Sequence, residues 1–389
     1  MKRLILSLLI LGLCQSLCFS AAMTLAVTPA GAGDKSGENG SGVADWQNAM
    51  GEAEFETDVE TATEAGDSYF LAGGTYNLGS SIATGRDGLV TAPILITGVK
   101  AATTAEPPTV TDWAYGTDRP LIVGGAWAFE FDNYWQIRNL RVTSTRSGSS
   151  AGMGCDAGCL MYNCKADNTS SGRGLDCDGI MISSEATSAT GSGIVSSGLI
   201  INSYAHDSGI CIQAGSTLTI ASSVADTCTT GIGIAASNDV IVINNTIFNS
   251  TTGISGTSGF RHRILNNIID TCTMGAEWTT ETPINYFDYN AWGNNTDDVA
   301  LVTQGENAIT SASTYIASAG GGDFTVASGS GVLDVGLQFD TNIGVTGDYK
   351  VNIGVDQDDN TPAATGRRRM FIAGEKPTLW DIQKMWNIK

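Results

Sequence analysis

Four glycines recur at one fixed spacing, at positions Gly209, Gly231, Gly253 and Gly275, which defines a 22-residue period. The residue after each glycine repeats as well, as Ile210, Ile232, Ile254 and Ala276. A fixed period of about 20–50 residues is typical of solenoids, in which each repeat is one structural unit stacked on its neighbour. The spacing therefore constrains the fold more than any other feature of this chain.

Aligning the repeats on the 22-residue period gives columns with physical meaning. One column is apolar and contains Leu199, Ala221, Ile243 and Leu265. Another holds polar and sulfur side chains, at His206, Cys228, Ser250 and Cys272. Short runs of β-branched residues separated by Asn, Ser, Thr and Gly predict short strands joined by turns. Stacked coils would pair these strands in parallel about 4.8 Å apart, and Asn245 and Asn267 would form a ladder of stacked amides.

The repeats resemble those of the right-handed parallel β-helix in the pectate-lyase-like superfamily. The resemblance rests on residues 243–247 and 265–269, each followed by a glycine of the repeating column, and extends to residues 45–49 and 65–76, which look like the N-terminal cap helix and first strand of that fold. It covers roughly residues 24–356. It implies an all-β protein, a single right-handed parallel β-helix of period 22 with an N-terminal helical cap. It does not imply one activity, because one fold hosts many functions.

The ends of the chain predict four segments. Residues 1–22 have the basic start, short apolar core and small-residue cleavage site of a secretory signal peptide. Residues 23–65 would form an N-terminal strand and the cap helix, residues 66–356 the β-helix, and residues 357–389 a basic tail with a short helix. That tail, or the β-helix flank, could support a homo-oligomer. The protein is therefore expected to be secreted or held at the cell surface.

The charge of the chain limits its partners. Its net charge is −20, and cleavage of the signal peptide would remove Lys2 and Arg3 but no acid, giving −22. A protein with so large a negative charge is not expected to attract nucleic acid through its overall electrostatic potential. No stretch after the signal peptide is apolar for long enough to predict insertion into a membrane.

Seven cysteines follow the signal peptide, and export permits disulfides. Cys155 and Cys177 are separated by one full period, so their sulfur atoms should stack on neighbouring coils within bonding reach. Cys228 and Cys272 are separated by two periods, or two coils, which argues against a bond between them. We therefore predict a Cys155–Cys177 disulfide and interpret Cys228 and Cys272 as small buried hydrophobic residues.

Three stretches interrupt the period, at residues 101–119, 144–158 and 184–197. In a solenoid, function often lies in such insertions. Trp113 and Tyr115 in the first insertion are candidates for stacking on sugar rings, with packing against the first coils as the alternative. For Trp127 and Trp135 we favour packing.

The strongest cluster of chemically active side chains contains Asp176, Asp178, His206 and Asp207, which we take as candidate catalytic residues. Hydrolases use paired carboxyl groups in different environments as acid and base. Asp156 and Asp178 are also separated by one period, and a cation such as calcium could offset their repulsion. The alternative is that these aspartates are solvent-exposed turn residues. No cofactor other than calcium is suggested.

These patterns predict a secreted β-helix protein that engages extracellular polysaccharide. A non-catalytic binding or surface-structural role is the first hypothesis. A polysaccharide lyase or glycoside hydrolase acting in a groove on the β-helix flank is the second. A fibre or tail-spike-like module of a virion is a third, which the signal peptide disfavours.

Overall fold

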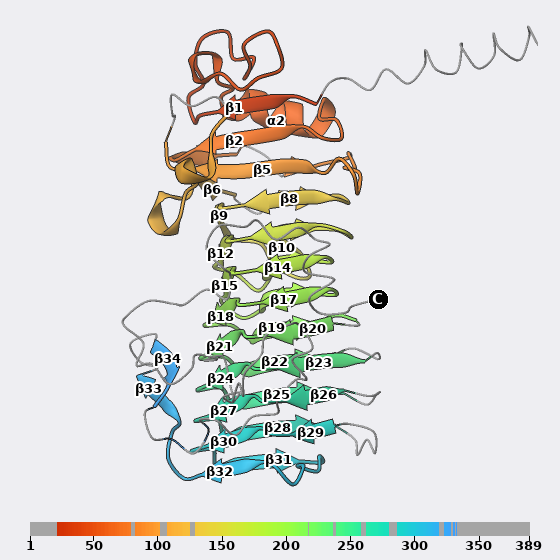
Figure 1. Ribbon diagram of the computed structural model, residues 1–389, viewed down its shortest axis with the longest axis vertical. Helices are drawn as coiled ribbons and strands as arrows, with labels where there is room; N and C mark the ends of the chain where they lie inside the picture. Colours follow the sequence, from red (N-terminus) through yellow and green to blue (C-terminus); the bar gives the residue numbers. More distant parts are fainter. Residues whose placement is uncertain are drawn as a thin grey trace, which may run out of the picture. The chain divides into compact units, whose positions relative to one another are not determined.

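The computed structural model shows a parallel β-helix (Figure 1). It describes residues 22–78, 82–101, 107–124, 129–216, 218–235, 239–257, 262–279, 286–318, 323–327, 330 and 332. The chain divides into two compact units between Gly191 and Ser192. Most of the predicted signal peptide, Trp127 and the predicted C-terminal tail and helix lie outside the described residues.

Each unit is built from three parallel sheets, which we call A, B and C in the order in which one coil visits them. In unit 1, sheet A consists of β1 (Thr24–Val27), β2 (Ser68–Ala72), β5 (Ile94–Val99), β8 (Trp135–Arg138), β11 (Leu160–Tyr162) and β14 (Ile180–Ile182). Sheet B consists of β3 (Thr75–Asn77), β6 (Leu121–Val123), β9 (Arg141–Ser144), β12 (Lys165–Asn168) and β15 (Glu185–Ser188). Sheet C consists of β4 (Ile82–Ala83), β7 (Phe129–Phe131), β10 (Ala151–Cys155) and β13 (Arg173–Cys177).

Unit 1 also carries the described helices. These are the 3-10 helices η1 (Trp46–Asn48), η2 (Val110–Asp112) and η3 (Gly116–Asp118) and the α-helix α2 (Glu52–Thr61). Phe55 of α2 is buried and its ring meets that of Tyr69 edge to face, with centroids 5.5 Å apart. The same ring stacks on Phe129, with centroids 6.3 Å apart. The helix therefore covers apolar side chains of the first coils, as a cap must.

Unit 2 repeats the same coil. Sheet A consists of β17 (Leu199–Ile201), β20 (Leu218–Ala221), β23 (Val240–Ile243), β26 (Arg263–Leu265) and β29 (Tyr286–Asp288). Sheet B consists of β18 (Tyr204–His206), β21 (Val224–Asp226), β24 (Thr246–Phe248), β27 (Ile268–Asp270), β30 (Ala291–Gly293) and β32 (Ile309–Ser311). Sheet C consists of β16 (Ser192–Ser196), β19 (Ile210–Ala214), β22 (Thr230–Ile234), β25 (Thr252–Gly256), β28 (Met274–Trp278) and β31 (Asp297–Ala300).

The core of unit 2 is a stack of aliphatic side chains in register from coil to coil. Ile220, Val242 and Ile264 occupy one such stack, and all three are fully buried. Because neighbouring side chains on a strand point to opposite faces, the residues beside them lie on the outer face of sheet A. β-Branched residues suit this pleated, half-buried surface, which explains their enrichment in the runs.

The predicted asparagine ladder is confirmed. The side-chain amide of Asn245 donates to Oδ1 of Asn267 at 3.0 Å, and the amide of Asn267 donates to Oδ1 of Asn290 at the same distance. All three side chains are buried. The neighbouring Asn244 and Asn266 adopt left-handed backbone conformations, with φ of 56° and 55°, which asparagine tolerates better than most residues. Both asparagine columns are therefore part of the scaffold.

The repeat period holds through only part of the glycine column. Gly231, Gly253 and Gly275 are in register, since Thr230 pairs with Thr252 and Thr252 with Met274. Gly209 is not in this column, because Ile210 pairs with Thr230, whereas a full period would pair it with Ile232. Residues 215–217 join β19 to β20, whereas the longer segment 235–239 joins β22 to β23. The shorter loop makes the coil that begins at β19 two residues shorter than the coil that begins at β22.

The altered coil length corrects two predicted columns. Leu199 pairs with Thr219, so it does not belong with Ala221 and the apolar residues that follow. His206 pairs with Asp226 rather than sharing a column with Cys228. The constant period was extrapolated one coil too far toward the N-terminus, and this error matters for the site described below.

An antiparallel hairpin of β33 (Ile316–Ser318) and β34 (Asp323–Val326) lies beside sheet B of unit 2 (Figure 1). Ile316 and Val326 share a buried cluster with Ile268 and Ala291, and Phe248 and Phe324 pack against it. Asp270 is fully buried there and accepts hydrogen bonds from the backbone N–H of Tyr315 at 2.6 Å and the hydroxyl of Thr314 at 2.8 Å. Sheet B is therefore covered near its last strands.

Candidate functional site

The four candidate catalytic residues fall in two different units. Asp176 lies in β13 of unit 1, with Asp178 just after that strand. His206 ends β18 of unit 2, and Asp207 follows it. The two pairs are considered separately below.

The unit 1 pair lies among other acids. Asp176 forms an ion pair with Arg173 three residues earlier. Burial raises the pKa of Asp176, Arg173 opposes that shift, and the charges of Asp178 and Asp156 add to it. Asp156 and Asp178 are exposed. Among the described residues, no group of three or more His, Cys, Asp or Glu side chains is placed to hold a metal ion, so calcium at Asp156 and Asp178 stays a prediction.

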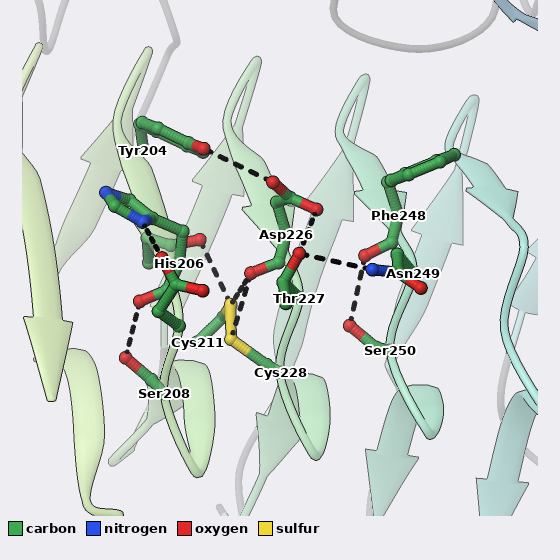
Figure 2. Close-up of a disulfide and its surroundings, with 12 residues drawn as sticks. Tyr204, His206, Ser208, Cys211, Asp226, Thr227, Cys228, Phe248, Asn249 and Ser250 are labelled. Atoms are coloured by element: carbon green, nitrogen blue, oxygen red, sulfur yellow. Dashed lines mark hydrogen bonds and ion pairs between the residues drawn. A yellow bond between two sulfur atoms is a disulfide. The ribbon is translucent and has the colours of Figure 1, made fainter. Parts of the chain in front are cut away.

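The unit 2 pair belongs to a compact group on the outer face of sheet B (Figure 2). Nδ1 of His206 lies 2.7 Å from Oδ2 of Asp207, and the His206 ring stacks on that of Tyr204 with centroids 4.4 Å apart. The Tyr204 hydroxyl donates to Oδ2 of Asp226 at 3.3 Å, and the Thr227 hydroxyl donates to Oδ1 at 2.8 Å. The register of β18 and β21 brings these side chains together, because His206 and Asp226 are partners.

Local sequence explains why these side chains point outward. Tyr204 and His206 alternate with Ala205, which is fully buried, so both lie on the opposite face of the strand. Asp207 and Thr227 then adopt left-handed conformations, with φ of 49° and 56°. This turn ends the sheet B strand and leaves the Asp207 side chain 65% exposed.

The two carboxyl groups have different surroundings. Burial raises the pKa of Asp226, and the nearby Asp207 charge adds to the shift. Hydrogen bonds from Thr227 and Tyr204 and the charge of His206 act in the opposite direction. Asp207, in contrast, is exposed and paired with His206. The two carboxyl groups thus differ in burial and in hydrogen-bond partners, as paired carboxyl groups in acid–base chemistry do.

One aromatic ring of the hairpin, that of Phe324, borders the group. The ring of Phe324 lies 5.7 Å from that of Tyr204 and 6.3 Å from that of Phe248. We call Tyr204, His206, Asp207, Asp226 and Phe324 the sheet B cluster. The cluster lies where the hairpin stops covering sheet B. It combines aromatic rings with carboxyl and imidazole groups, and these groups suit a polar ligand that has apolar faces.

A disulfide between Cys211 and Cys228 lies next to His206 and Asp226 of the sheet B cluster (Figure 2). The interpretation of Cys228 as a lone buried hydrophobic residue is therefore wrong. The two cysteines are 17 residues apart with Cα atoms at 5.8 Å, so they are diagonal neighbours on adjacent coils. A search for disulfide partners among residues of the same repeat column therefore cannot find this bond. Cys272 is a buried thiol and not bonded to Cys228, as expected.

The predicted sugar-stacking residues lie in unit 1. Trp113 is partly buried and packs beside a buried cluster that includes Ala26 and Val99. The guanidinium carbon of Arg138 lies 5.6 Å from the centre of its ring. Tyr115 is partly buried. Packing therefore accounts for much of the Trp113 surface, and a carbohydrate role for these two residues stays a prediction. Trp135 is fully buried, as the packing interpretation requires.

Sequence reasoning found part of this site and missed the rest. It selected His206 and Asp207, but did not include Asp226, Tyr204 or Phe324. The alternating Tyr-Ala-His of residues 204–206 is a signal for two outward side chains. Recognising Asp226 would have required a coil shorter than the period, and nothing in the repeats predicts the contact of Phe324.

Comparisons with known proteins find a similar solved structure and a similar protein family. A solved structure described as "Crystal structure of pectate lyase Pel9A" superposes with a TM-score of 0.57 at 13% identity, over 88% of this chain and 98% of that one. The chain thus has the parallel β-helix fold of the pectate-lyase-like class. Residues 158–324 are similar to a family described as "Periplasmic copper-binding protein (NosD)". No curated protein sequence matches the chain significantly.

The pKa of Asp226 leads to a test by pH. A raised pKa in the folded state means that ionisation of Asp226 opposes folding, so its contribution to stability falls as pH rises from the unfolded value, about 3.9, through the folded one. Asp226→Asn cannot ionise. The thermal midpoint of the variant, relative to the wild type, should therefore be higher at pH 7 than at pH 4. A difference that stays constant or reverses with pH would contradict the assignment.

Proposed function

We propose that this protein is an exported β-helix protein that binds polysaccharide through the sheet B cluster. The observation that carries the proposal is the half-exposed group of aromatic, carboxyl and imidazole side chains around Tyr204 and Asp226. Sugar rings present apolar faces to aromatic side chains and hydroxyl groups to carboxylates, so the group matches both surfaces of a glycan.

Export is supported by two independent features. Residues 1–22 have the pattern of a secretory signal peptide, and the family similar to residues 158–324 is described as periplasmic. Among the described residues, no helix is sufficiently long and apolar to cross a membrane. The Cys211–Cys228 disulfide is also in keeping with an oxidising compartment.

Copper is named in the description of that family but does not enter this proposal. Among the described residues, no three His, Cys, Asp or Glu side chains are placed to hold a metal ion together, and this includes the buried thiols. Burial raises the pKa of Cys155 well above its ordinary value, which opposes the thiolate that a copper ion requires. The part of the chain that the structure describes therefore does not fit a resident copper ion.

Retention on immobilised glycans tests the binding function. Tyr204→Ala removes the central ring of the cluster, and we expect about a tenfold loss of affinity, because one aromatic contact contributes about 1–1.5 kcal/mol. Tyr286→Ala is the matched control, since Tyr286 is an exposed ring on sheet A of the same unit. Equal retention of both variants, or no retention of the wild type on neutral, amino-sugar and uronate polymers, would reject the proposal.

A catalytic role is the second candidate, favoured by the different environments of Asp207 and Asp226. In this version Asp226 is the proton donor and Asp207, with His206, is the base. The assay follows new reducing ends and new ultraviolet absorbance from unsaturated products. Calcium is added or chelated, because Asp156 and Asp178 are the proposed calcium ligands, and Asp176→Asn and Asp178→Asn are tested beside Asp226→Asn. Binding without any product would leave only the binding function.

A further inference from the structure

Three buried cysteines of unit 1 lie together with no part in the site described above. Cys155 ends β10 and Cys177 ends β13, and the two residues are direct partners in the parallel register. Their sulfur atoms lie 3.2 Å apart. The thiol of Cys155 also interacts with that of Cys159. All three side chains are buried and present as thiols.

The surroundings of the three thiols distinguish them. The Cys159 thiol donates to the backbone carbonyl of Asp132 at 3.1 Å and accepts from the backbone N–H of Trp135 at 3.3 Å. It therefore links its coil to the preceding one as a hydrogen-bonding group. The Cys155 sulfur, in contrast, has only sulfur partners among the contacts of the described residues. The Cys177 sulfur lies 3.2 Å from that of Cys155 and 3.8 Å from the backbone carbonyl oxygen of Ile180.

We propose that Cys155 and Cys177 are a redox pair that closes to a disulfide joining two neighbouring coils, while Cys159 stays a thiol. Parallel partners lie about 4.8 Å apart, inside the Cα separation of about 4.4–6.8 Å that disulfides span. The sulfur atoms need to approach by only about 1.2 Å to reach bonding distance. Each thiol loses one proton and one electron, and an external small disulfide, such as oxidised glutathione, accepts both electrons and protons and becomes two thiols.

The position of the pair indicates which interaction the disulfide would offset. Asp156 follows Cys155 and Asp178 follows Cys177, so two exposed carboxylates are placed on neighbouring coils directly beside the sulfurs. Like charges on adjacent strands repel and favour separation of the coils. A covalent link between the preceding residues would hold the coils together against that repulsion. It also closes a loop one coil long, which restricts the unfolded chain.

Peptide mapping of the exported full-length protein tests this pairing. The protein is incubated with excess oxidised glutathione, denatured, alkylated without reduction and digested. We expect a cross-linked peptide containing Cys155 and Cys177, lighter by two hydrogen atoms than its reduced parts, with Cys159 alkylated. Alkylation of both Cys155 and Cys177, or a cross-link from either one to Cys159, overturns the proposal.

Thermal unfolding with and without dithiothreitol provides the second measurement. Reduction should lower the midpoint of the wild type, and the decrease should be smaller in Cys177→Ser, where only the Cys211–Cys228 bond is left to reduce. Cys272→Ala is the matched control, because Cys272 is also a buried thiol but has no sulfur among its hydrogen-bond partners in the described structure. It should respond to reductant as the wild type does. Equal responses of all three proteins overturn the proposal.

Discussion

Replacing Asn267 with leucine is expected to lower the free energy of unfolding by about 3–5 kcal/mol, because it breaks the asparagine ladder at its centre. Oδ1 of Asn267 accepts from both the backbone and side-chain N–H groups of Asn245, each at 3.0 Å. Its amide donates to the carbonyl of Val242 at 3.0 Å. Leucine has a similar volume but no polar atom. The backbone N–H of Asn245 and one N–H of its side-chain amide would be left buried without partners, and the carbonyl of Val242 would lose one of its hydrogen bonds.

The cost follows from the burial of these groups. Asn245 and Asn267 are 1% and 0% exposed, so water cannot replace the lost bonds. Each buried group without a partner costs about 1–3 kcal/mol. Urea unfolding followed by tryptophan fluorescence would measure the loss, and amide hydrogen exchange would locate it, since exchange at Asn245 should accelerate more than exchange at distant strands.

Asn249→Gly is the control for the ladder prediction. Asn249 is exposed and has a left-handed backbone with φ of 50°, which glycine adopts without strain. Its side chain makes only a surface hydrogen bond to Thr227, so its replacement should change stability by less than about 1 kcal/mol. If Asn267→Leu were as mild as this control, the ladder would not be a major source of stability.

The ladder illustrates what the sequence can predict in a repeat protein. A residue that recurs at the coil period must occupy equivalent positions on adjacent coils wherever the coil length is constant. Asn245 and Asn267 satisfy that condition, and so do Cys155 and Cys177, whose register the structure confirms. The stacked solenoid and the scaffold role of the asparagines followed from this rule, whereas the parallel β-helix was implied by the resemblance of the repeats to a known family.

The same rule explains the errors. The coil that contains His206 is two residues shorter than the next coil because of the loop at residues 215–217, and a fixed period assigned the wrong partner to His206. The Cys211–Cys228 bond joins residues from different columns. The contact of Phe324 with Tyr204 comes from a hairpin outside the repeat. Loop lengths, diagonal contacts and added segments have no periodic signature, and together they build the candidate site.

The glycine column provides the second large effect. Gly253→Ala is expected to destabilise unit 2 by about 2–4 kcal/mol, or to prevent its folding, because the coils are too close for a methyl group. A Cβ atom at Gly253 would lie 2.5 Å from the carbonyl oxygen of Gly275 and 2.5 Å from a methyl group of Ile269. Both distances are far inside van der Waals contact. The obstacle includes backbone of the next coil, so a rotamer change cannot remove it.

A graded series of substitutions separates this steric cost from the general effect of replacing glycine. At Gly233, the nearest atom to an added Cβ would be a methyl carbon of Ile210, at 3.1 Å, and a small shift of that side chain would suffice. At Gly85, no atom lies within 4 Å of the added carbon. Thermal midpoints should therefore fall in the order Gly85→Ala, Gly233→Ala, Gly253→Ala, with Gly85→Ala close to the wild type. The recurrence of glycine at positions 231, 253 and 275 would then be explained by the distance between coils, and equal effects at Gly85 and Gly253 would refute that explanation.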